Sequence, residues 1–321
     1  MTVKGVAQML VAEPTDGEAA FKLAQLFRYG QQRQGLRMRL WMPLATSLRT
    51  ESPWFRLAKP GVLQTQLHPA PALLLLSDAA DWRAAQAFYG DRPDLPKIHL
   101  LHRADLRQWG HGALGQPAIR VALGEAVAQA LKDHPEIREP IAVMPLGMDP
   151  EDLPPAPVVK TGCLVLARDQ PALGLALHQA LQAQGIPTMC ELSPWPLLQW
   201  QRALAAAEVV VVLSSVQAPG LDLRRLAAMA LGTVVVMDEP SFDDGLCRDG
   251  ENALIRLADG QELAKAVRQV QDDPGLRRRL IAGGRSTLLR YRTARERLCF
   301  NDLIDSLADH WSTARASHRA L

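Results

Sequence analysis

The sequence predicts an α/β protein made of two doubly wound domains, each with a parallel sheet covered by helices on both faces. Short, continuously apolar segments alternate with longer segments of helical periodicity. A proline-rich stretch interrupts this alternation once, after which it starts again. The length of 321 residues also fits two domains of ordinary size. In such pairs of domains ligands bind in the cleft, at the carboxyl ends of the strands.

In the first half of the chain, the apolar segments and the periodic segments between them define one α/β unit. The predicted strands are 6–11, 38–42, 72–76, 98–101, 119–123 and 141–144. The predicted helices are 17–34, 79–89 and 124–133. These elements form a predicted N-terminal domain at 1–148.

Prolines at 150, 154, 155 and 157 predict an extended linker over 149–160, because this spacing fits neither a helix nor a central strand. Beyond it, strands are predicted at 163–166, 188–192, 209–213 and 234–237. Helices are predicted at 172–184, 197–207, 221–231 and 261–271, and the segment from 274 to about 314 is predicted to be helical throughout. The second domain is therefore 161–290, followed by a tail at 291–321.

The tail is predicted to be an amphipathic helix that packs on another surface. Apolar residues recur there at helical spacing, and they are Leu298, Phe300, Leu303, Ile304 and Leu307.

Composition restricts the classes of function. Hydrophobic residues make up 48% and charged residues 22% of the chain, which is typical of a globular protein. The net charge of +2 is too near neutral to indicate nucleic-acid binding, and the basic residues lack the interleaved aromatics of nucleic-acid modules. We therefore predict that nucleic acid is not a partner.

Basic residues gather in one part of the first half. Between residues 21 and 60 there are eight Lys and Arg residues against one acidic residue, Glu51. One interpretation is a solvated basic face. The other is a surface that meets anionic lipid or an acidic acceptor.

The cysteines and the apolar runs bear on localisation. The four cysteines are scattered among apolar neighbours without a CxxC pair, which predicts buried thiols in a reducing compartment. The sequence opens without a recognisable signal peptide, and its longest apolar runs are far too short to span a bilayer. The predicted localisation is cytoplasmic, or at most peripheral at the inner face of the membrane.

The segment 214–252 is the most informative part of the sequence. It comprises a strand, a Gly/Pro turn, a helix, a glycine, a second strand and an acidic loop. A glycine turn that opens a helix gathers free backbone N–H groups at the positive end of the helix, where a diphosphate can bind. Gly220 would let the backbone approach the phosphates closely. The alternative is an ordinary βαβ turn without a ligand.

Several ordered motifs resemble the group 1 family of retaining glycosyltransferases. Residues 219–236 read P-G-L-D-L-R-R-L-A-A-M-A-L-G-T-V-V-V, close to the family's E-G-F-G-L-P-x-L-E-A-M-A-x-G-x-P-V-V. The family's D-G-x-N loop is similar to residues 249–252, and its D-P-x-L-R helix start is similar to residues 273–277. The family's inter-domain motif resembles 144–149. The resemblance covers about residues 141 to 298.

The resemblance implies the GT-B fold, with two Rossmann-like domains facing a cleft and a C-terminal helix crossing back to the first domain. It also implies transfer of a sugar, with retained anomeric configuration, from a nucleotide-sugar donor to a glycan, lipid-linked or protein acceptor in bacterial surface glycan synthesis. The nucleotide-sugar is then a substrate, and we expect neither a metal nor a cofactor.

The same resemblance assigns a donor-binding set. Its members are Arg168, Pro219, Gly220, Leu221, Asp222, Leu223 and Ala227. Arg168 matches the arginine that the family places after the first strand of this domain. Three positions depart from the family: its two glutamates are Pro219 and Ala227 here, and its phosphate-binding lysine is Leu173. Asp222 is interpreted either as a replacement polar group near the sugar or as a helix cap.

In the first domain, the strand at 98–101 is followed by His102 and Asp105. Side chains at the carboxyl end of a parallel strand face the ligand cleft, and related glycosyltransferases often have a histidine there. His102, Asp105 and Asp222 are therefore the candidate catalytic residues. His99, within the strand, is expected to be a hydrogen-bonded core histidine.

Two rival functions remain. The departures at Leu173, Pro219 and Ala227 also fit a catalytically degenerate GT-B protein that acts as a partner or scaffold in a glycosylation complex. A nucleotide-sugar epimerase of the same fold is less favoured, because the several carboxylates and histidines that such enzymes need cannot be assembled from this sequence.

Overall fold

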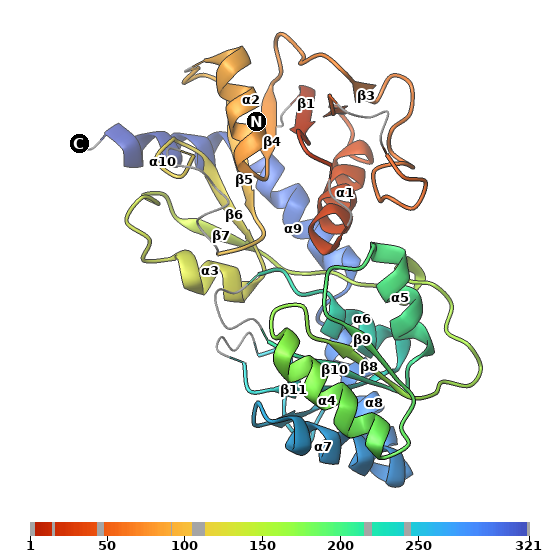
Figure 1. Cartoon of the computed structure of the whole chain (residues 1–321). Coiled ribbons are helices and arrows are strands. Elements are labelled where there is room, and N and C mark those ends of the chain that lie inside the picture. Colours follow the sequence, from red (N-terminus) through yellow and green to blue (C-terminus); the bar gives the residue numbers. More distant parts are fainter. Residues whose placement is uncertain are drawn as a thin grey trace. The chain divides into compact units, whose positions relative to one another are not determined.

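A computed structural model shows the fold of the chain (Figure 1). It describes residues 4–14, 17–43, 48–90, 92–104, 113–214, 220–240 and 245–319. The contacts divide the chain into unit 1, with Met1–Pro145, Ala218–Leu221 and Glu296–Leu321, and unit 2, with Leu146–Gln217 and Asp222–Arg295. The predicted linker at 149–160 thus groups with unit 2, and the tail joins unit 1 from Glu296 onward.

Unit 1 contains a sheet of seven strands in the order β3-β2-β1-β4-β5-β6-β7, and every pairing is parallel (Figure 1). The strands are β1 Gly5–Leu10, β2 Leu36–Trp41, β3 Leu63–Gln64, β4 Leu73–Leu76, β5 Lys97–Leu101, β6 Ile119–Leu123 and β7 Ile141–Met144. All residues of β4, β5 and β6 are buried, as in a parallel sheet covered on both faces. The chain leaves the centre of the sheet after β1, reaches one edge, and returns to the other side of β1 at β4.

The helices of unit 1 come from both ends of the sequence. They are α1 Glu18–Gln31, α2 Ala79–Tyr89, α3 Glu125–Leu131 and, from the C-terminal segment, α9 Thr293–Asp305 and α10 Leu307–Arg319. Helix α2 begins at a capping box, in which the Asp78 carboxylate accepts the N–H groups of Ala80 and Asp81, both at 2.9 Å. Trp82 and Tyr89 of this helix then pack into the core.

Unit 2 is a second doubly wound layer structure around a five-stranded parallel sheet of order β12-β11-β10-β8-β9. Its strands are β8 Cys163–Leu166, β9 Thr188–Glu191, β10 Val209–Val212, β11 Val234–Asp238 and β12 Ala253–Arg256. Its helices are α4 Pro171–Ala183, α5 Leu197–Ala206, α6 Arg224–Leu231, α7 Gly260–Asp272 and α8 Pro274–Leu288, with the short 3₁₀ helix η3 at Pro150–Asp152.

A glycine sets how closely α4 approaches the sheet of unit 2. A Cβ atom on Gly174 would lie 2.1 Å from the Cβ atom of Ala167, which directly follows β8. Real Cβ atoms do not come this close, so only glycine allows this contact. The first turns of α4 therefore pack directly onto the carboxyl end of β8.

Apart from the tail, every strand and helix predicted from the sequence is present, with ends shifted by a few residues. Two strands were not predicted. Strand β3 has only two residues and lies at the sheet edge, so it has no detectable periodicity. Strand β12, Ala253–Arg256, directly follows the segment 249–252 that resembles a family loop, and its apolar run is too short to stand out as a strand.

The prediction of one continuous tail helix is wrong. The segment forms α8, α9 and α10, interrupted at 289–292 and at Ser306. No glycine or proline marks the first break; there the Tyr291 carbonyl oxygen accepts the Met148 N–H at 2.8 Å, a contact distant in sequence. Leu298, predicted on the apolar face, is 62% exposed, whereas Phe300 and Ile304 are fully buried. The linker prediction also needs correction, because Pro150 begins η3, a first helical position that proline tolerates.

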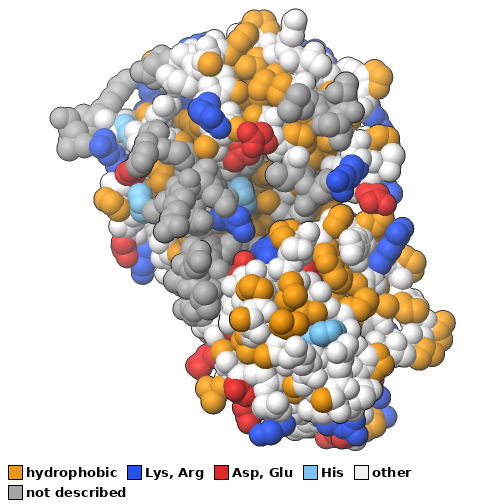
Figure 2. All heavy atoms as spheres, in the orientation of Figure 1, with side chains coloured by type: hydrophobic (Ala, Val, Ile, Leu, Met, Phe, Trp, Pro, Cys, Tyr) orange, Lys and Arg blue, Asp and Glu red, His pale blue; other side chains and the backbone are white. Residues whose placement is uncertain are grey.

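The basic segment and the cysteines show a mixture of environments. Lys22 is fully buried, so it belongs to neither the solvated face nor the docking surface that the sequence suggested. On the face shown in Figure 2, Lys and Arg side chains lie scattered among acidic and hydrophobic ones. Cys163 and Cys247 are buried as predicted, but Cys190 and Cys299 are partly exposed.

A fully buried ion pair ties α9 to α1 within unit 1. The Lys22 Nζ atom lies 3.0 Å from Glu296 Oε1 and also donates to the Gln25 side chain at 2.6 Å. The Tyr29 hydroxyl donates to Glu296 Oε2 at 2.9 Å. Both charged side chains are 0% exposed, so each depends on the other for neutralisation. The C-terminal segment is therefore held to the first helix by a charge pair that water does not reach.

We predict that Lys22→Met strongly destabilises unit 1, because it leaves the Glu296 carboxylate buried without its cation. Removal of one partner of a buried pair typically costs about 3–5 kcal/mol of unfolding free energy. The double variant Lys22→Met/Glu296→Leu should recover much of this loss. Guanidinium chloride unfolding provides the measurement.

The matched control is Arg268→Ala, which removes an exposed pair with Asp272 on α7 and should change the unfolding free energy by about 0.5 kcal/mol or less. A Lys22→Met variant as stable as this control would contradict the assigned role of the buried pair.

Candidate functional site

The strand order of unit 2 has its topological switch point between β8 and β10. From β8 the chain crosses to β9 on one side of β8, and it then returns to β10 on the other side of β8. The connections that follow β8 and β10 therefore run in opposite directions along the sheet. In doubly wound sheets ligands bind outside the carboxyl ends of the strands at this point. The residues that emerge there are those after Leu166 and after Val212.

Three polar residues join the strand ends at this point. The Gln170 Nε2 atom donates to the Ser214 carbonyl oxygen at 2.9 Å and to Asp238 Oδ2 at 2.6 Å. The Ser214 N–H donates to Asp238 Oδ1 at 2.7 Å. Asp238 is 2% exposed. We call this group the Gln170–Ser214–Asp238 clasp, because it connects the loops after β8 and β10 to the end of β11.

Arg168 lies in the turn between β8 and α4, two positions before Gln170. Its side chain is 28% exposed, and its Nε atom lies 3.5 Å from Asp169 Oδ1. A guanidinium group has five N–H donors in a planar fork, which suits the oxygens of a phosphate. Arg168, assigned to the donor from its sequence motif, is thus a partly exposed cation at the switch point.

Asp222 lies just before α6, whose N-cap residue is Leu223. Oδ1 of Asp222 accepts the Arg224 N–H at 3.0 Å, and Oδ2 lies 2.9 Å from Arg225 Nε. Burial alone would raise the pKa of Asp222, but the guanidinium groups of Arg225 and Arg224 and the N–H bond lower it. Asp222 is therefore ionised and contacts the first turn of α6 without occupying the N-cap position.

Two residues of the predicted donor set have side chains in the interior. Leu223 and Ala227 are 0% exposed and form part of the core beneath α6. Leu173, at the position of the family lysine, packs against the hydrophobic core of unit 2. Apolar packing thus fills positions where the family has charged groups.

Gly220 and Leu221 pair with the end of β5 within unit 1. Gly220 forms an antiparallel bridge with Arg103, and the Leu221 N–H donates to the His102 carbonyl oxygen at 2.7 Å. This N–H group was expected to face a phosphate. In the structure it satisfies a backbone carbonyl instead, because Gly220 extends antiparallel to Arg103.

His102 follows β5 directly, at the carboxyl end of the sheet of unit 1. Burial of the imidazole and then the positive charge of Arg103 lower the pKa of His102 to about 4. The ring is therefore neutral near pH 7, so it can accept or donate a hydrogen bond but carries no charge. Asp105 and Pro219, two of the predicted site residues, lie outside the described residues.

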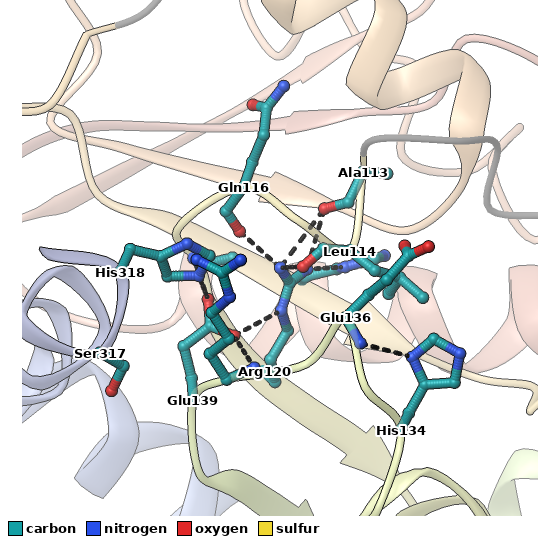
Figure 3. A network of polar contacts seen from close by, with 12 residues as sticks. Ala113, Leu114, Gln116, Arg120, His134, Glu136, Glu139, Ser317 and His318 are labelled. Carbon is teal, nitrogen blue, oxygen red and sulfur yellow. Dashed lines mark hydrogen bonds and ion pairs between the residues drawn. The ribbon is translucent and has the colours of Figure 1, made fainter. Parts of the chain in front are cut away.

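A buried polar network around Arg120 connects β6 to residues 113–116 and to Glu139 (Figure 3). Arg120 of β6 donates to three carbonyl oxygens in 113–116, and its Nε atom lies 3.5 Å from Glu139 Oε2. Glu139 also meets His318 of α10 at 2.8 Å. His99 contacts Arg120 at 2.5 Å and is fully buried, so it is the core histidine that the sequence predicted.

Unit 1 has its own carboxylate at the equivalent point between β1 and β4. Oδ1 of the fully buried Asp81 accepts the Ala12 N–H at 2.8 Å, just after β1. Oδ2 accepts the N–H and hydroxyl groups of Ser77, just after β4, both at 2.9 Å. Burial raises the pKa of Asp81 to about 7 and the Asp78 charge acts in the same direction, whereas the hydrogen bonds from Ala12 and Ser77 oppose this shift.

Sequence reasoning missed Gln170, Asp238 and Asp81. Asp238 could have been recognised as the polar residue that ends an apolar strand, the same signal that identified His102. Asp81 could have been recognised as the fourth residue of a capping-box pattern that starts at Asp78. Gln170 gave no local signal, because its partners lie 44 and 68 residues away.

The described residues contain neither a membrane-spanning helix nor a cluster of metal-binding side chains. Within the described ranges, every helix is too short or too polar to cross a lipid bilayer. In the same ranges, His, Cys, Asp and Glu side chains do not gather in groups of three that would hold a metal ion.

We predict that His102 stays neutral over the physiological pH range. Because its pKa in the folded protein is below the usual 6.5, its contribution to stability is present above about pH 6.5 and is lost as the pH falls through about 4. His102→Gln should remove this dependence. Melting temperatures of the two proteins across this range test it, and parallel curves would contradict the assigned environment of the ring.

Comparisons with known proteins agree with this topology. The model of the family described as glycosyl transferase-like matches residues 177–301. A search of curated proteins found no match. Among solved structures, sucrose-phosphate synthase from Thermosynechococcus elongatus has a TM-score of 0.68 at 13% identity, covering 95% of this chain and 100% of that chain.

Two further solved structures are similar over nearly the whole chain. A glycosyltransferase from Rickettsia africae has a TM-score of 0.66 at 12% identity, covering 95% of this chain and 99% of its own. HepE from Anabaena, solved in complex with UDP-glucose, has a TM-score of 0.69 at 15% identity, covering 94% and 99%.

Identities this low establish the fold and not the substrate. The family match covers the segment from α4 into α9, which includes β10, α6 and β11 around the switch point. The family match over residues 177–301 supports a sugar-transfer function. The chain has the GT-B fold, and its residues 177–301 match the family described as glycosyl transferase-like.

Proposed function

We propose that the chain is a glycosyltransferase that binds a nucleotide-sugar donor at the carboxyl ends of β8 and β10. The observation that carries the proposal is Arg168, a partly exposed cation in the turn after β8 at the point where doubly wound sheets bind ligands. The residue also stands where the resembling family has its donor-binding arginine. The proposal therefore rests on a position in the fold and on a sequence motif.

The chemistry needs positive charge at this position. As the bond between the sugar and the diphosphate breaks, negative charge collects on the leaving diphosphate and must be stabilised. Leu173 supplies no charge, since its side chain packs on the core. Arg168 is then the main cation of the site, and Arg224 and Arg225 at the start of α6 are the next candidates. Their charges are already balanced in part by Glu191 and Asp222.

The candidate catalytic residues take different roles under this proposal. Asp222 accepts the Arg224 N–H and pairs with Arg225 at the start of α6, which supports a structural role. His102, neutral near pH 7, would hydrogen-bond a sugar or acceptor hydroxyl and would not donate a proton from a charged form.

We also propose the donor and the class of acceptor. UDP-glucose is the first donor to test, because a protein of the same fold, HepE, is solved with it. The acceptor class we propose is a glycan, a lipid-linked sugar or a protein in bacterial surface glycan synthesis, with retention of the anomeric configuration. Peripheral contact of a cytoplasmic protein with an anionic membrane belongs to the same proposal, and the basic segment at 21–60 supports it.

Calorimetric titration with UDP, GDP, CMP and dTDP tests the donor site. We expect one nucleotide to bind and Arg168→Ala to weaken that binding at least about tenfold, which is about 1.4 kcal/mol. The control Arg268→Ala removes an exposed arginine from α7 and should bind as the wild type does. Equal affinity of Arg168→Ala and the wild type would overturn the assignment of Arg168.

The scaffold alternative predicts a different result from the same protein. If Leu173, Pro219 and Ala227 mark a lost donor site, all four nucleotides will fail to bind. Donor hydrolysis or sugar transfer with any nucleotide-sugar would instead exclude the scaffold. Detection of the released nucleotide during incubation with UDP-glucose is the corresponding assay.

A further inference from the structure

The Gln170–Ser214–Asp238 clasp lies beyond the paired part of the sheet. Strands β8 and β10 pair up to Leu166 and Val212, and the Leu213 N–H donates to the Leu166 carbonyl oxygen at 3.0 Å. Gln170 and Ser214 both follow these last ladder contacts. The clasp therefore lies outside the β8–β10 ladder. It connects Gln170, in the segment after β8, to Ser214 and to Asp238.

The turn after β8 belongs to the candidate donor site, because it carries Arg168, two residues before Gln170. Asp238 is a buried carboxylate at the end of β11. It accepts one hydrogen bond from the Gln170 side chain and one from the Ser214 N–H. A change at Asp238 or Gln170 would thus release the Arg168 turn from the ends of β10 and β11.

The two side chains are chemically matched to this arrangement. A single glutamine nitrogen has two N–H donors, one for the Ser214 carbonyl oxygen and one for Asp238 Oδ2. The two oxygens of an ionised aspartate accept from both sides. Glutamate in place of Gln170 would have nearly the same shape but no donor, and its charge would repel Asp238.

We propose that Gln170 and Asp238 are positioning residues of the donor site, which hold the Arg168 loop in place to receive the donor diphosphate. The inference rests on the proposed function, because it names the groups that organise that same site. Neither residue is proposed to touch the donor. Both act through Arg168, and this dependence makes the proposal testable.

The experiment is calorimetric titration of the full chain with the nucleotide that the wild type binds. Gln170→Glu should weaken the affinity at least about tenfold. The double variant Gln170→Glu/Asp238→Asn should regain a substantial part, because the new amide donates to the new carboxylate across the same gap. In an Arg168→Ala background, Gln170→Glu should have little further effect, because the group through which it acts is gone.

The control separates positioning from general loss of stability. Thr287→Val removes a buried hydrogen bond of 2.8 Å from Asn252, which precedes β12 at the amino edge of the same sheet. This variant should lower the melting temperature and leave the nucleotide affinity unchanged. Titrations are run at a temperature where circular dichroism shows every variant to be folded. A variant too unstable for this is replaced by Gln170→Asn, which shortens the donor by one methylene and should also weaken binding.

The outcomes distinguish the two proposals. If the wild type binds a nucleotide and folded Gln170→Glu binds it equally well, the positioning role is overturned and the proposed function stands. If Gln170→Glu weakens binding as strongly in the Arg168→Ala background as in the wild type, the clasp does not act through Arg168 and the inference also fails. If the wild type binds none of the four nucleotides, both proposals fall.

Discussion

Both units depend on a buried aspartate that satisfies backbone N–H groups where the parallel strands end. A sheet ladder pairs the backbone only up to its last residue, and the loops beyond it bring polar groups into a region that water does not fully reach. Asp81 accepts bonds from the chain after β1 and after β4 in unit 1. Asp238 receives bonds from the chain after β10 and from Gln170 in unit 2. In each unit the carboxylate connects the chain segments that follow two neighbouring strands, β1 and β4 in unit 1 and β8 and β10 in unit 2. These are the strands between which the crossover connections change direction along the sheet.

Under the proposed function, this arrangement gives the donor site at these strand ends a defined shape. Loops generally have more freedom than the elements they connect. The hydrogen bonds of Asp238 to Gln170 and Ser214 restrain the chain at these two residues without a change in the strands. Hydrogen bonds to an ionised group are shorter and stronger than those between neutral groups, which fits the 2.6 Å and 2.7 Å bonds of Asp238. The geometry around Arg168 is then a property of the scaffold and need not be formed by the donor.

Two buried ion pairs lie in the interior of unit 1. Lys22 meets Glu296, and Arg120 meets Glu139 together with a set of carbonyl oxygens. Both pairs also involve the C-terminal segment: Glu296 lies on α9, and His318 of α10 contacts Glu139. The last helices therefore belong to the core of unit 1, where Glu296 neutralises Lys22 of α1.

The sequence by itself determined the two α/β units, nearly all of their strands and helices, and the positions of Arg168 and His102 after particular strands. These features follow from local periodicity, from continuous apolar runs and from motifs whose residues are neighbours in the chain.

Features made by residues that are far apart in the sequence become evident only in the folded structure. The breaks at 289–292 and Ser306 follow no local signal, and Leu298 of α9 is exposed although its spacing predicts an apolar face. Lys22 is buried because Glu296 neutralises it from 274 residues away. The Leu221 N–H is satisfied by His102, and Gln170 by Ser214 and Asp238. A hydrogen bond or ion pair leaves no trace in local periodicity when its partners are distant, so its existence depends on how the folded chain brings them together.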